Sequence, residues 1–193
     1  MSQRLIVILA IVGLTLGYTV YEAMKLEKKI SEPGEYYKSN SILKFLPSIQ
    51  LNVFNTDKKV ALNELAESGN HLVVHFWATW CAPCEKELPT LKELTEKLKD
   101  KKNVKFLFIA VNDKVKDVTK FLKKYNLEDR ENILILEDKS FYHQKSFGTY
   151  KLPETFVFSS QKSLLKRFVG PQEWDRAEFF QYIRSPFLII YML

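Results

Sequence analysis

The sequence predicts an α/β fold in which a central mixed β-sheet is flanked by helices on both faces. Apolar, strand-like runs alternate with amphipathic helical patterns through the middle of the chain. Two further strand-like runs, Thr155–Phe158 and Leu164–Val169, then follow each other with no helix between them. Alternation of strands and helices favours parallel pairing, and a closing hairpin adds antiparallel strands, so the sheet should be mixed.

The first element is the N-terminal segment Leu5–Tyr21, an uncharged and mostly apolar run. It is longer than the apolar core of about 7–15 residues in a signal peptide, and it reaches the short end of the roughly 17–25 residues that span a bilayer. We therefore expect residues 1–23 to form an uncleaved membrane anchor, with a cleaved signal peptide as the alternative. The polar residues 24–44 predict a tether.

A strand and a helix are predicted on either side of the two cysteines. Leu72–Trp77 is rich in β-branched and aromatic residues, which predicts a buried strand. After the cysteines, leucines recur at helical spacing and predict the apolar face of an amphipathic helix: Leu88, Leu91, Leu94 and Leu98. Pro89 should kink this helix, because a proline beyond the first turn removes a backbone hydrogen bond.

The alternation then continues. In chain order, the pattern predicts a core strand, an amphipathic helix, a short strand and a short helix at Val104–Val111, Val115–Tyr125, Ile133–Leu136 and Ser140–Phe147. After the hairpin, a helix over residues 174–184 closes a domain that covers residues 45–184. The apolar residues 185–193 are too few to span a bilayer. We expect this tail to dock onto the domain, with membrane or partner contact as the alternative.

The charge of the chain is modest. The net charge is +6 at pH 7, and the lysines are interspersed with glutamates. A nucleic-acid site requires a concentrated basic stripe, so we expect no nucleic-acid partner. The charge is that of a solvated surface, and a weak attraction to acidic lipids or proteins stays open.

The chemistry centres on Cys81 and Cys84, the two cysteines of the chain. They lie where the predicted strand gives way to the predicted helix. A helix N-terminus carries unpaired N–H groups and a partial positive charge, which favour a thiolate over a thiol. Such sites lower a cysteine pKa from about 8.5 into a range of roughly 3.5–7.5, and the thiolate is the form that attacks disulfides. The pair therefore predicts a reversible dithiol.

Two other uses of the cysteines can be weighed. A structural zinc site requires about four nitrogen or sulfur ligands. The chain has three histidines, of which His71 and His75 would lie roughly 13 Å apart along one strand. We therefore expect no metal, and an inert buried pair of cysteines remains the other alternative.

A family resemblance supports the redox interpretation. The run Phe76–Cys84, followed by Glu87 and Pro89, resembles the active-site signature of the thioredoxin-like proteins of the TlpA, ResA and CcmG type. A second block, Gly148–Phe156, resembles the segment that carries the family's cis-proline. Gly170 and Trp174 match a weaker third block, and Leu46–Leu51 followed by Val60–Leu65 resembles the family's N-terminal hairpin. The resemblance implies a thioredoxin fold with an N-terminal β-hairpin and a central insertion.

The resemblance also implies roles around the dithiol. Cys81, at the exposed tip of the helix, would attack the substrate, and Cys84 would resolve the mixed disulfide. Glu87 lies on the same helix face as Cys84, where its carboxylate could accept a proton or raise a thiol pKa. The alternative for Glu87 is a favourable interaction with the helix dipole. In the preceding strand, we expect Trp77 and His75 to pack in the core, with a proton shuttle as the alternative for His75.

A second set of residues is expected to bind the substrate. Pro83 shapes the loop between the cysteines, and Trp80 caps the dithiol, with core packing as its alternative. Pro153 would follow a cis peptide bond and face the cysteines, while the backbone of Leu152 pairs with an extended substrate segment. The alternative is a trans bond at the entry of a strand. Glu154 either selects partners or is simply solvated.

The sequence thus predicts a membrane-anchored thiol–disulfide oxidoreductase, with a redox-active disulfide in place of a cofactor. The resemblance implies an apocytochrome c substrate, a membrane thiol electron donor and a position outside the cytoplasmic membrane. Lys25, Lys28 and Lys29 behind the anchor would by the positive-inside rule keep the domain in the cytoplasm. We expect the outer side because domain-sized segments translocate largely regardless of charge.

Two other functions can be separated from this one. Thiolates suit Cu(I), so a copper-handling protein is the main alternative, although it would need a further ligand and His143 is a poor candidate. Peroxide reduction is disfavoured because the nucleophile lies in a Cys-Ala-Pro-Cys pair.

Overall fold

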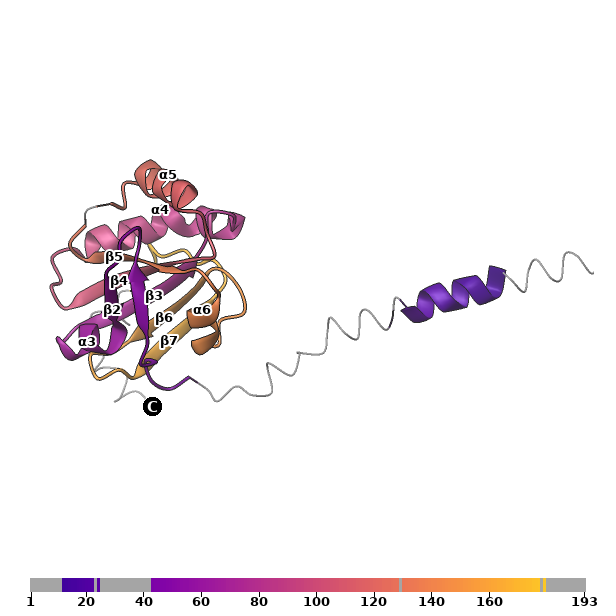
Figure 1. Ribbon diagram of the computed structural model, residues 1–193, viewed down its shortest axis with the longest axis horizontal. Coiled ribbons are helices and arrows are strands. Elements are labelled where there is room, and N and C mark those ends of the chain that lie inside the picture. Colours follow the sequence, from indigo (N-terminus) through magenta and orange to yellow (C-terminus); the bar gives the residue numbers. More distant parts are fainter. Residues whose placement is uncertain (1–11, 23, 25–42, 129, 178, 180–193) are drawn as a thin grey trace, which may run out of the picture. The chain divides into compact units, whose positions relative to one another are not determined.

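The computed structural model describes residues 12–22, 24, 43–128, 130–177 and 179 (Figure 1). The chain divides into two compact units, Met1–Ile42 and Leu43–Leu193. In the first unit, residues 12–22 are helical and expose apolar side chains such as Leu14. Within the described ranges, no helix is both long and apolar enough to cross a membrane. Most of the tether predicted at residues 24–44, and the tail at 185–193, lie outside the described residues.

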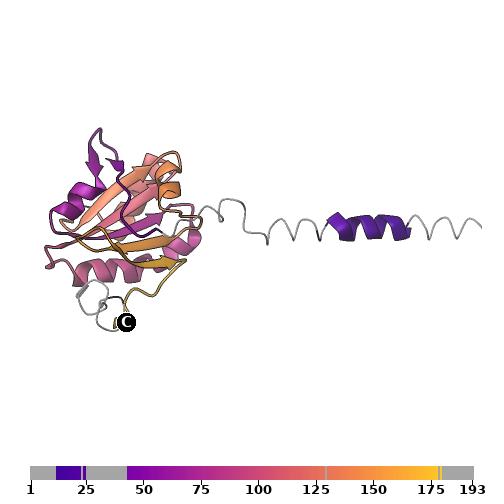
Figure 2. The same cartoon turned by 90° about the horizontal axis from the view of Figure 1, so that it is seen from below.

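The second unit is built on a seven-stranded mixed sheet with the order β2-β1-β5-β4-β3-β6-β7 (Figures 1 and 2). In chain order, β1 to β7 span Gln50–Val53, Lys59–Ala61, His71–Trp77, Val104–Val111, Ile133–Asp138, Glu154–Phe158 and Leu164–Val169. The three central strands β3, β4 and β5 are parallel, and the outer pairs are antiparallel. The predicted mixed sheet and closing hairpin are confirmed.

Helices cover both faces of this sheet. The helices α4 (Ala82–Lys97) and α5 (Val115–Tyr125) enclose one core, which contains both cysteines. On the other face, α3 (Leu62–Glu67) and the phenylalanines that flank α6 (Tyr142–Ser146) enclose a second core. Because side chains alternate along a strand, His75 and Trp77 of β3 point toward α4, whereas Phe76 points the opposite way.

Several predicted element boundaries differ from the structure, and at two places the difference changes the type of element. The N-terminal hairpin forms, with β1 antiparallel to β2, but its second strand ends at Ala61 and residues from Leu62 onward are helical. Leu62 and Ala66 are both fully buried, and their spacing of four residues suits a helix face rather than a strand. At the other end, Trp174 lies in a turn and helical residues begin at 177. The rest of that predicted helix lies outside the described residues.

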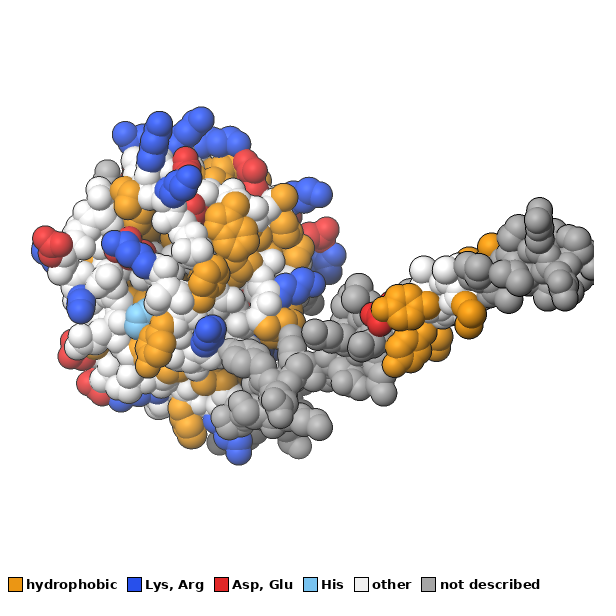
Figure 3. Space-filling model, turned by 45° about the vertical axis from the view of Figure 1, so that its right-hand side comes forward, with side chains coloured by type: hydrophobic (Ala, Val, Ile, Leu, Met, Phe, Trp, Pro, Cys, Tyr) orange, Lys and Arg blue, Asp and Glu red, His pale blue; other side chains and the backbone are white. Residues whose placement is uncertain are grey.

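The charges of the second unit are mixed. On the face shown in Figure 3, basic side chains lie among acidic and apolar ones. Exposed ion pairs such as Lys124–Glu85 and Lys99–Glu96 join opposite charges on the helical surface. Pairs of this kind contribute little to stability, typically about 0–1 kcal/mol each.

Candidate active site

Cys81 and Cys84 form a disulfide at the start of α4. Cys81 is the N-cap residue, and the Cys84 backbone N–H donates to its Sγ at 3.3 Å. The Cys81 sulfur therefore lies where the unpaired N–H groups and the dipole of the helix favour negative charge. Cys81 is 6% exposed and Cys84 is 2% exposed. Cys81 is the more accessible of the two, but the expectation of an exposed tip is wrong for this disulfide form.

The turn before Cys81 is held by the loop that follows β4. Asp113 accepts hydrogen bonds from the backbone N–H of Thr79 at 2.5 Å and from the Thr79 hydroxyl at 2.8 Å. The indole N–H of Trp80 reaches the carbonyl of Asn112 at 3.3 Å. Sequence reasoning missed Asp113 and Asn112, because their only signal is a polar pair directly after an apolar strand.

Trp80 lies at the surface, and its side chain is 59% exposed. Core packing, the alternative considered for this residue, is therefore wrong. Trp77, in contrast, is buried against the Phe121 ring at a centroid distance of 4.7 Å. The prediction that Trp77 packs in the core is confirmed.

A groove of about 610 Å³ opens beside the disulfide. It is lined by Trp80, Cys81, Ala82, Pro83, Phe141, Gln144, Tyr150, Lys151 and Leu152. The Leu152–Pro153 peptide bond that follows is cis. The fold thus brings together the start of α4 and the segment before β6, which are about seventy residues apart in the sequence.

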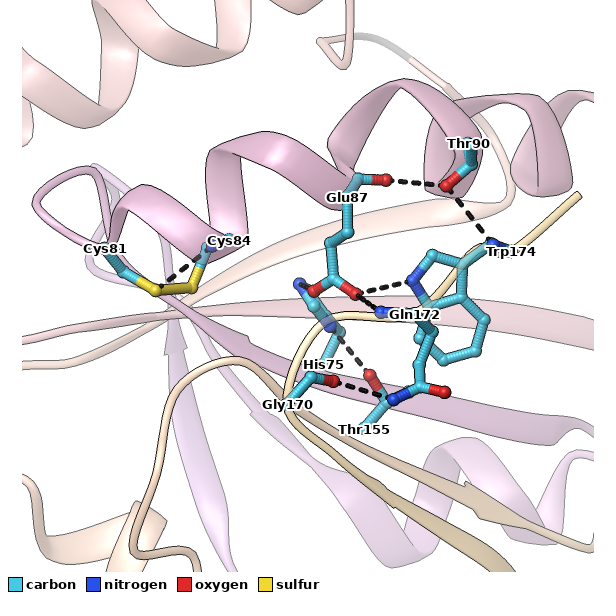
Figure 4. Close-up of polar contacts among 9 residues, drawn as sticks. All are labelled: His75, Cys81, Cys84, Glu87, Thr90, Thr155, Gly170, Gln172 and Trp174. Carbon is cyan, nitrogen blue, oxygen red and sulfur yellow. Dashed lines mark hydrogen bonds and ion pairs between the residues drawn. A yellow bond between two sulfur atoms is a disulfide. The ribbon is translucent and has the colours of Figure 1, made fainter.

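Glu87 is buried one turn beyond Cys84 on α4 (Figure 4). Its Oε2 accepts hydrogen bonds from the backbone N–H of Gln172 at 2.9 Å and from the indole N–H of Trp174 at 2.8 Å. Burial raises the pKa of Glu87 to about 7, and these two donors oppose the rise. Glu87 is thus a buried carboxyl held by two donors from the segment after β7.

His75 of β3 faces the Glu87 carboxyl from below in Figure 4. Its Nε2 lies 3.7 Å from Glu87 Oε1, and its Nδ1 lies 2.9 Å from the hydroxyl oxygen of Thr155. Burial lowers the pKa of His75 to about 3, so the imidazole is neutral and the contact is not an ion pair. His75 is a core residue of the strand, as expected, but one in contact with the carboxyl of the site.

Glu154 departs from both expectations for it. Its side chain is fully buried and forms an ion pair with Arg167 of β7. Arg167 also donates to the carbonyl of Gly148 at 2.9 Å. The interpretation of Glu154 as a solvated residue is therefore wrong, and its carboxylate does not lie on a surface that a partner could contact. A β6 residue next to Pro153 becomes buried because it points into the second core.

The described part of the chain contains no group of three or more His, Cys, Asp and Glu residues that could hold a metal ion. The functional groups of this site are the disulfide, the buried carboxyl of Glu87 one turn further along α4, and the neutral imidazole that faces this carboxyl. Such an arrangement can exchange disulfides and move a proton near the inner sulfur.

Comparisons with known proteins agree with this geometry. The family model described as Redoxin matches residues 44–183. A thiol-disulfide oxidoreductase ResA from Bacillus cereus is 28% identical over 178 residues, which cover 91% of each chain. A second ResA, from Bacillus subtilis (strain 168), is 27% identical over 164 residues, which cover 84% of this chain and 82% of that protein.

Among solved structures, a thiol:disulfide interchange protein of the thioredoxin family from Chlorobium tepidum TLS superposes with a TM-score of 0.60 at 22% identity, covering 74% of this chain and 94% of that one. A secreted Mycobacterium tuberculosis disulfide oxidoreductase homologous to E. coli DsbE gives a TM-score of 0.59 at 19% identity, covering 72% and 96%. At these identities the two structures establish the thioredoxin fold. With the family model matching most of the chain, the protein belongs to the Redoxin family, as a thiol–disulfide oxidoreductase of the TlpA, ResA and CcmG group.

Proposed function

We propose that this protein is a membrane-anchored disulfide reductase of the extracytoplasmic space that reduces apocytochrome c during cytochrome c maturation. The observation that supports this most is the Cys81–Cys84 disulfide at the N-terminus of α4, beside a groove that Leu152 also lines. A dithiol in this position can be ionised by the helix and can meet an extended chain at the same time.

The reaction begins with the reduced protein. The Cys81 thiolate attacks one sulfur of the substrate disulfide, that S–S bond breaks, and the other substrate sulfur leaves as a thiolate. Cys84 loses its proton and attacks Cys81, so the internal disulfide forms and the second substrate sulfur leaves. The protein dithiol gives up two electrons, the substrate disulfide takes up two, and a membrane thiol donor restores the dithiol.

Glu87 is the proposed acceptor of the Cys84 proton. It lies one turn from Cys84, and burial raises its pKa to about 7. A base whose pKa lies near the working pH is suited to accept and return a proton.

The groove is the proposed substrate site. Trp80, Pro83 and Leu152 supply apolar contacts next to Cys81, and the backbone groups of Leu152 would pair with an extended substrate segment. The ResA relatives are named thiol-disulfide oxidoreductases, which supports a protein disulfide as the substrate. The N-terminal residues 1–23, with their apolar run, are the proposed anchor.

The test follows electrons from the reduced full-length protein to oxidised apocytochrome c. We expect wild type to reduce the haem-binding cysteines, Cys81→Ala to be inactive, and Cys84→Ala to accumulate a mixed disulfide with the substrate. A wild-type protein that reduces no protein disulfide would refute the activity. Reduction of an unrelated protein disulfide, such as that of insulin, but not of apocytochrome c would refute the substrate alone.

A matched pair of surface variants tests the groove. Trp80→Ala removes an exposed aromatic side chain from the groove, and Phe45→Ala removes a similarly exposed one (62%) that does not line it. We expect KM for the protein substrate to rise in Trp80→Ala only. Equal effects in both variants would exclude the groove as the site.

A further inference from the structure

His75 occupies an unusual position for a core residue. All seven residues of β3 are buried, and His75 itself is 1% exposed. A buried imidazole requires hydrogen-bonding partners for both ring nitrogens. One nitrogen meets the Thr155 hydroxyl, and the other faces Glu87 Oε1.

The surroundings of Thr155 favour one tautomer of this imidazole. The Thr155 side chain is buried, and within the described residues its hydroxyl has the His75 Nδ1 as its partner. A hydroxyl that donates its proton to Nδ1 avoids a buried and unpaired O–H. The Nδ1 atom is then the acceptor, so the single N–H of the neutral ring lies on Nε2 and points toward Glu87.

The Glu87 carboxyl is therefore surrounded by donors. Oε2 already accepts from Gln172 and Trp174, whereas Oε1 has no hydrogen-bond partner among the described residues. Donors around a carboxylate favour its charged form. The distance of 3.7 Å between His75 Nε2 and Glu87 Oε1 is about 0.8 Å longer than a normal hydrogen bond of ~2.9 Å. A small movement of either side chain would therefore give Oε1 its donor.

Other charged groups do not compete for this carboxyl within the described residues that pack against it. On α4, Cys84 lies one turn before Glu87. His75 of β3 faces the carboxyl, Thr155 of β6 bonds to that imidazole, and the segment at residues 170–174 contributes the two donors. The ion pair of Glu154 and Arg167 lies on the opposite face of the sheet, because Glu154 and Thr155 are adjacent in β6.

We propose that His75 is a positioning residue for Glu87: the Nε2–H of His75 becomes the third donor to the carboxylate and favours its ionised form, which accepts the proton of Cys84. One proton moves from the Cys84 sulfur to a Glu87 oxygen, and His75 neither gains nor loses a proton. The low pKa of His75 agrees with a role in which the imidazole stays neutral. The inference rests on the proposed role of Glu87 in the exchange reaction.

The test measures the protonation of Glu87 directly, in the oxidised full-length protein and without substrate. The infrared carbonyl band of the protonated carboxyl, assigned by its loss in Glu87→Gln, is followed against pH. We expect His75→Leu to raise the midpoint by about one pH unit through loss of a donor. His75→Asn, whose amide retains an N–H donor, should restore part of the shift.

Two further variants separate this role from simple packing. Thr155→Val has the same shape but removes the hydroxyl that fixes the tautomer, so it should also raise the midpoint although it does not touch Glu87. His71→Leu removes the other buried histidine of β3, roughly 13 Å along the strand from His75, and should leave the midpoint unchanged.

The proposal is overturned if the midpoint stays in place or falls in Thr155→Val, or if nitrogen-15 shifts of wild-type His75 place its proton on Nδ1. Thr155→Val and the nitrogen-15 measurement decide the matter even where His75→Leu does not fold. Because no arm depends on turnover, a wild-type protein that fails to exchange disulfides would refute the proposed function, while the titration still decides the role of His75.

Discussion

At the scale of single residues, the pKa of Glu87 reflects both its burial and the donors that its proposed role as a base requires. A carboxyl inside a core is costly when ionised, and the cost is reduced by donors placed on its oxygens. The structure supplies two such donors from the segment after β7. The resulting pKa of about 7 leaves the group able to exist in either protonation state near neutral pH.

This pKa makes stability depend on pH. The unfolded chain releases the Glu87 proton near its ordinary pKa of 4.5, whereas the folded protein holds it up to about 7. The folded state therefore binds more protons than the unfolded chain in this interval. The contribution of Glu87 to the free energy of unfolding falls as pH rises from 4.5 to 7. We expect Glu87→Gln to flatten the decrease, as measured by urea unfolding of the oxidised protein at several pH values.

The control for this measurement is Glu64→Gln, which changes an exposed glutamate of α3. It should follow the wild-type profile throughout the interval. A Glu87→Gln profile that parallels wild type between pH 4.5 and 7 would show that Glu87 does not hold its proton in the folded state.

At the scale of elements, the start of α4 depends on the end of β4. The Asp113 carboxylate bonds to the backbone and the side chain of Thr79, two residues before Cys81. Charge-assisted hydrogen bonds of this kind are shorter and stronger than neutral ones. The turn that carries Trp80 and Cys81 is thus fixed by the loop that follows the neighbouring parallel strand, and this places the sulfur at the helix N-terminus.

We expect Asp113→Ala to destabilise the protein by about 1–3 kcal/mol, because it leaves the Thr79 N–H without its acceptor. Hydrogen exchange of the Thr79 and Trp80 amides should accelerate more than that of the core of β3. Asp175→Asn, at an exposed position, serves as the control. Unchanged exchange at Thr79 would mean that the carboxylate does not hold the turn.

The β6–β7 hairpin supports the other side of the groove. Arg167 of β7 joins the buried Glu154 to the carbonyl of Gly148, and residues 150–152 of the groove lie between those two points. The ion pair thus connects the sheet to the segment before Pro153. The ion pair positions this segment but adds little net stability, since the attraction between two buried charges roughly balances their desolvation cost.

Breaking this pair from one side should be costly. Arg167→Met leaves Glu154 buried without a cation, and we expect a loss of about 3 kcal/mol in the free energy of unfolding. The double variant Glu154→Gln with Arg167→Met should recover a large part of this loss, which chemical denaturation can measure. Additive losses in the double variant would show that the two side chains act independently.

At the scale of the whole molecule, local patterns predicted the elements better than the contacts between them. The strand at Val104–Val111 and the helix at Val115–Tyr125 have the predicted bounds, because their apolar residues follow a single period. The helix α3 was missed because Leu62 directly continues the apolar run Val60–Ala61 of the preceding strand. The contact of His75 with Glu87 depends on the packing of α4 on β3, and its only local signal is one polar residue in each apolar face.

The division of the chain into two units leads to the last prediction. All seven strands of the sheet and both cysteines lie within Leu43–Leu193, so we expect the core to fold without residues 1–42. We expect a protein that begins at Leu43 to unfold within a few degrees of the full-length chain, since a change below ~1 kcal/mol shifts Tm by roughly 2–8 °C. Its rate of protein disulfide reduction in solution should also be unchanged.

The same pair of proteins tests the membrane anchor. The apolar run at Leu5–Tyr21 should carry the full-length chain into the membrane fraction, and the protein that begins at Leu43 should stay in the supernatant. Removing residues 185–193 from the full-length chain controls for the apolar tail and should not release it. If the shortened protein still sediments with membranes, the N-terminal run is not the anchor, because the attachment then persists without it.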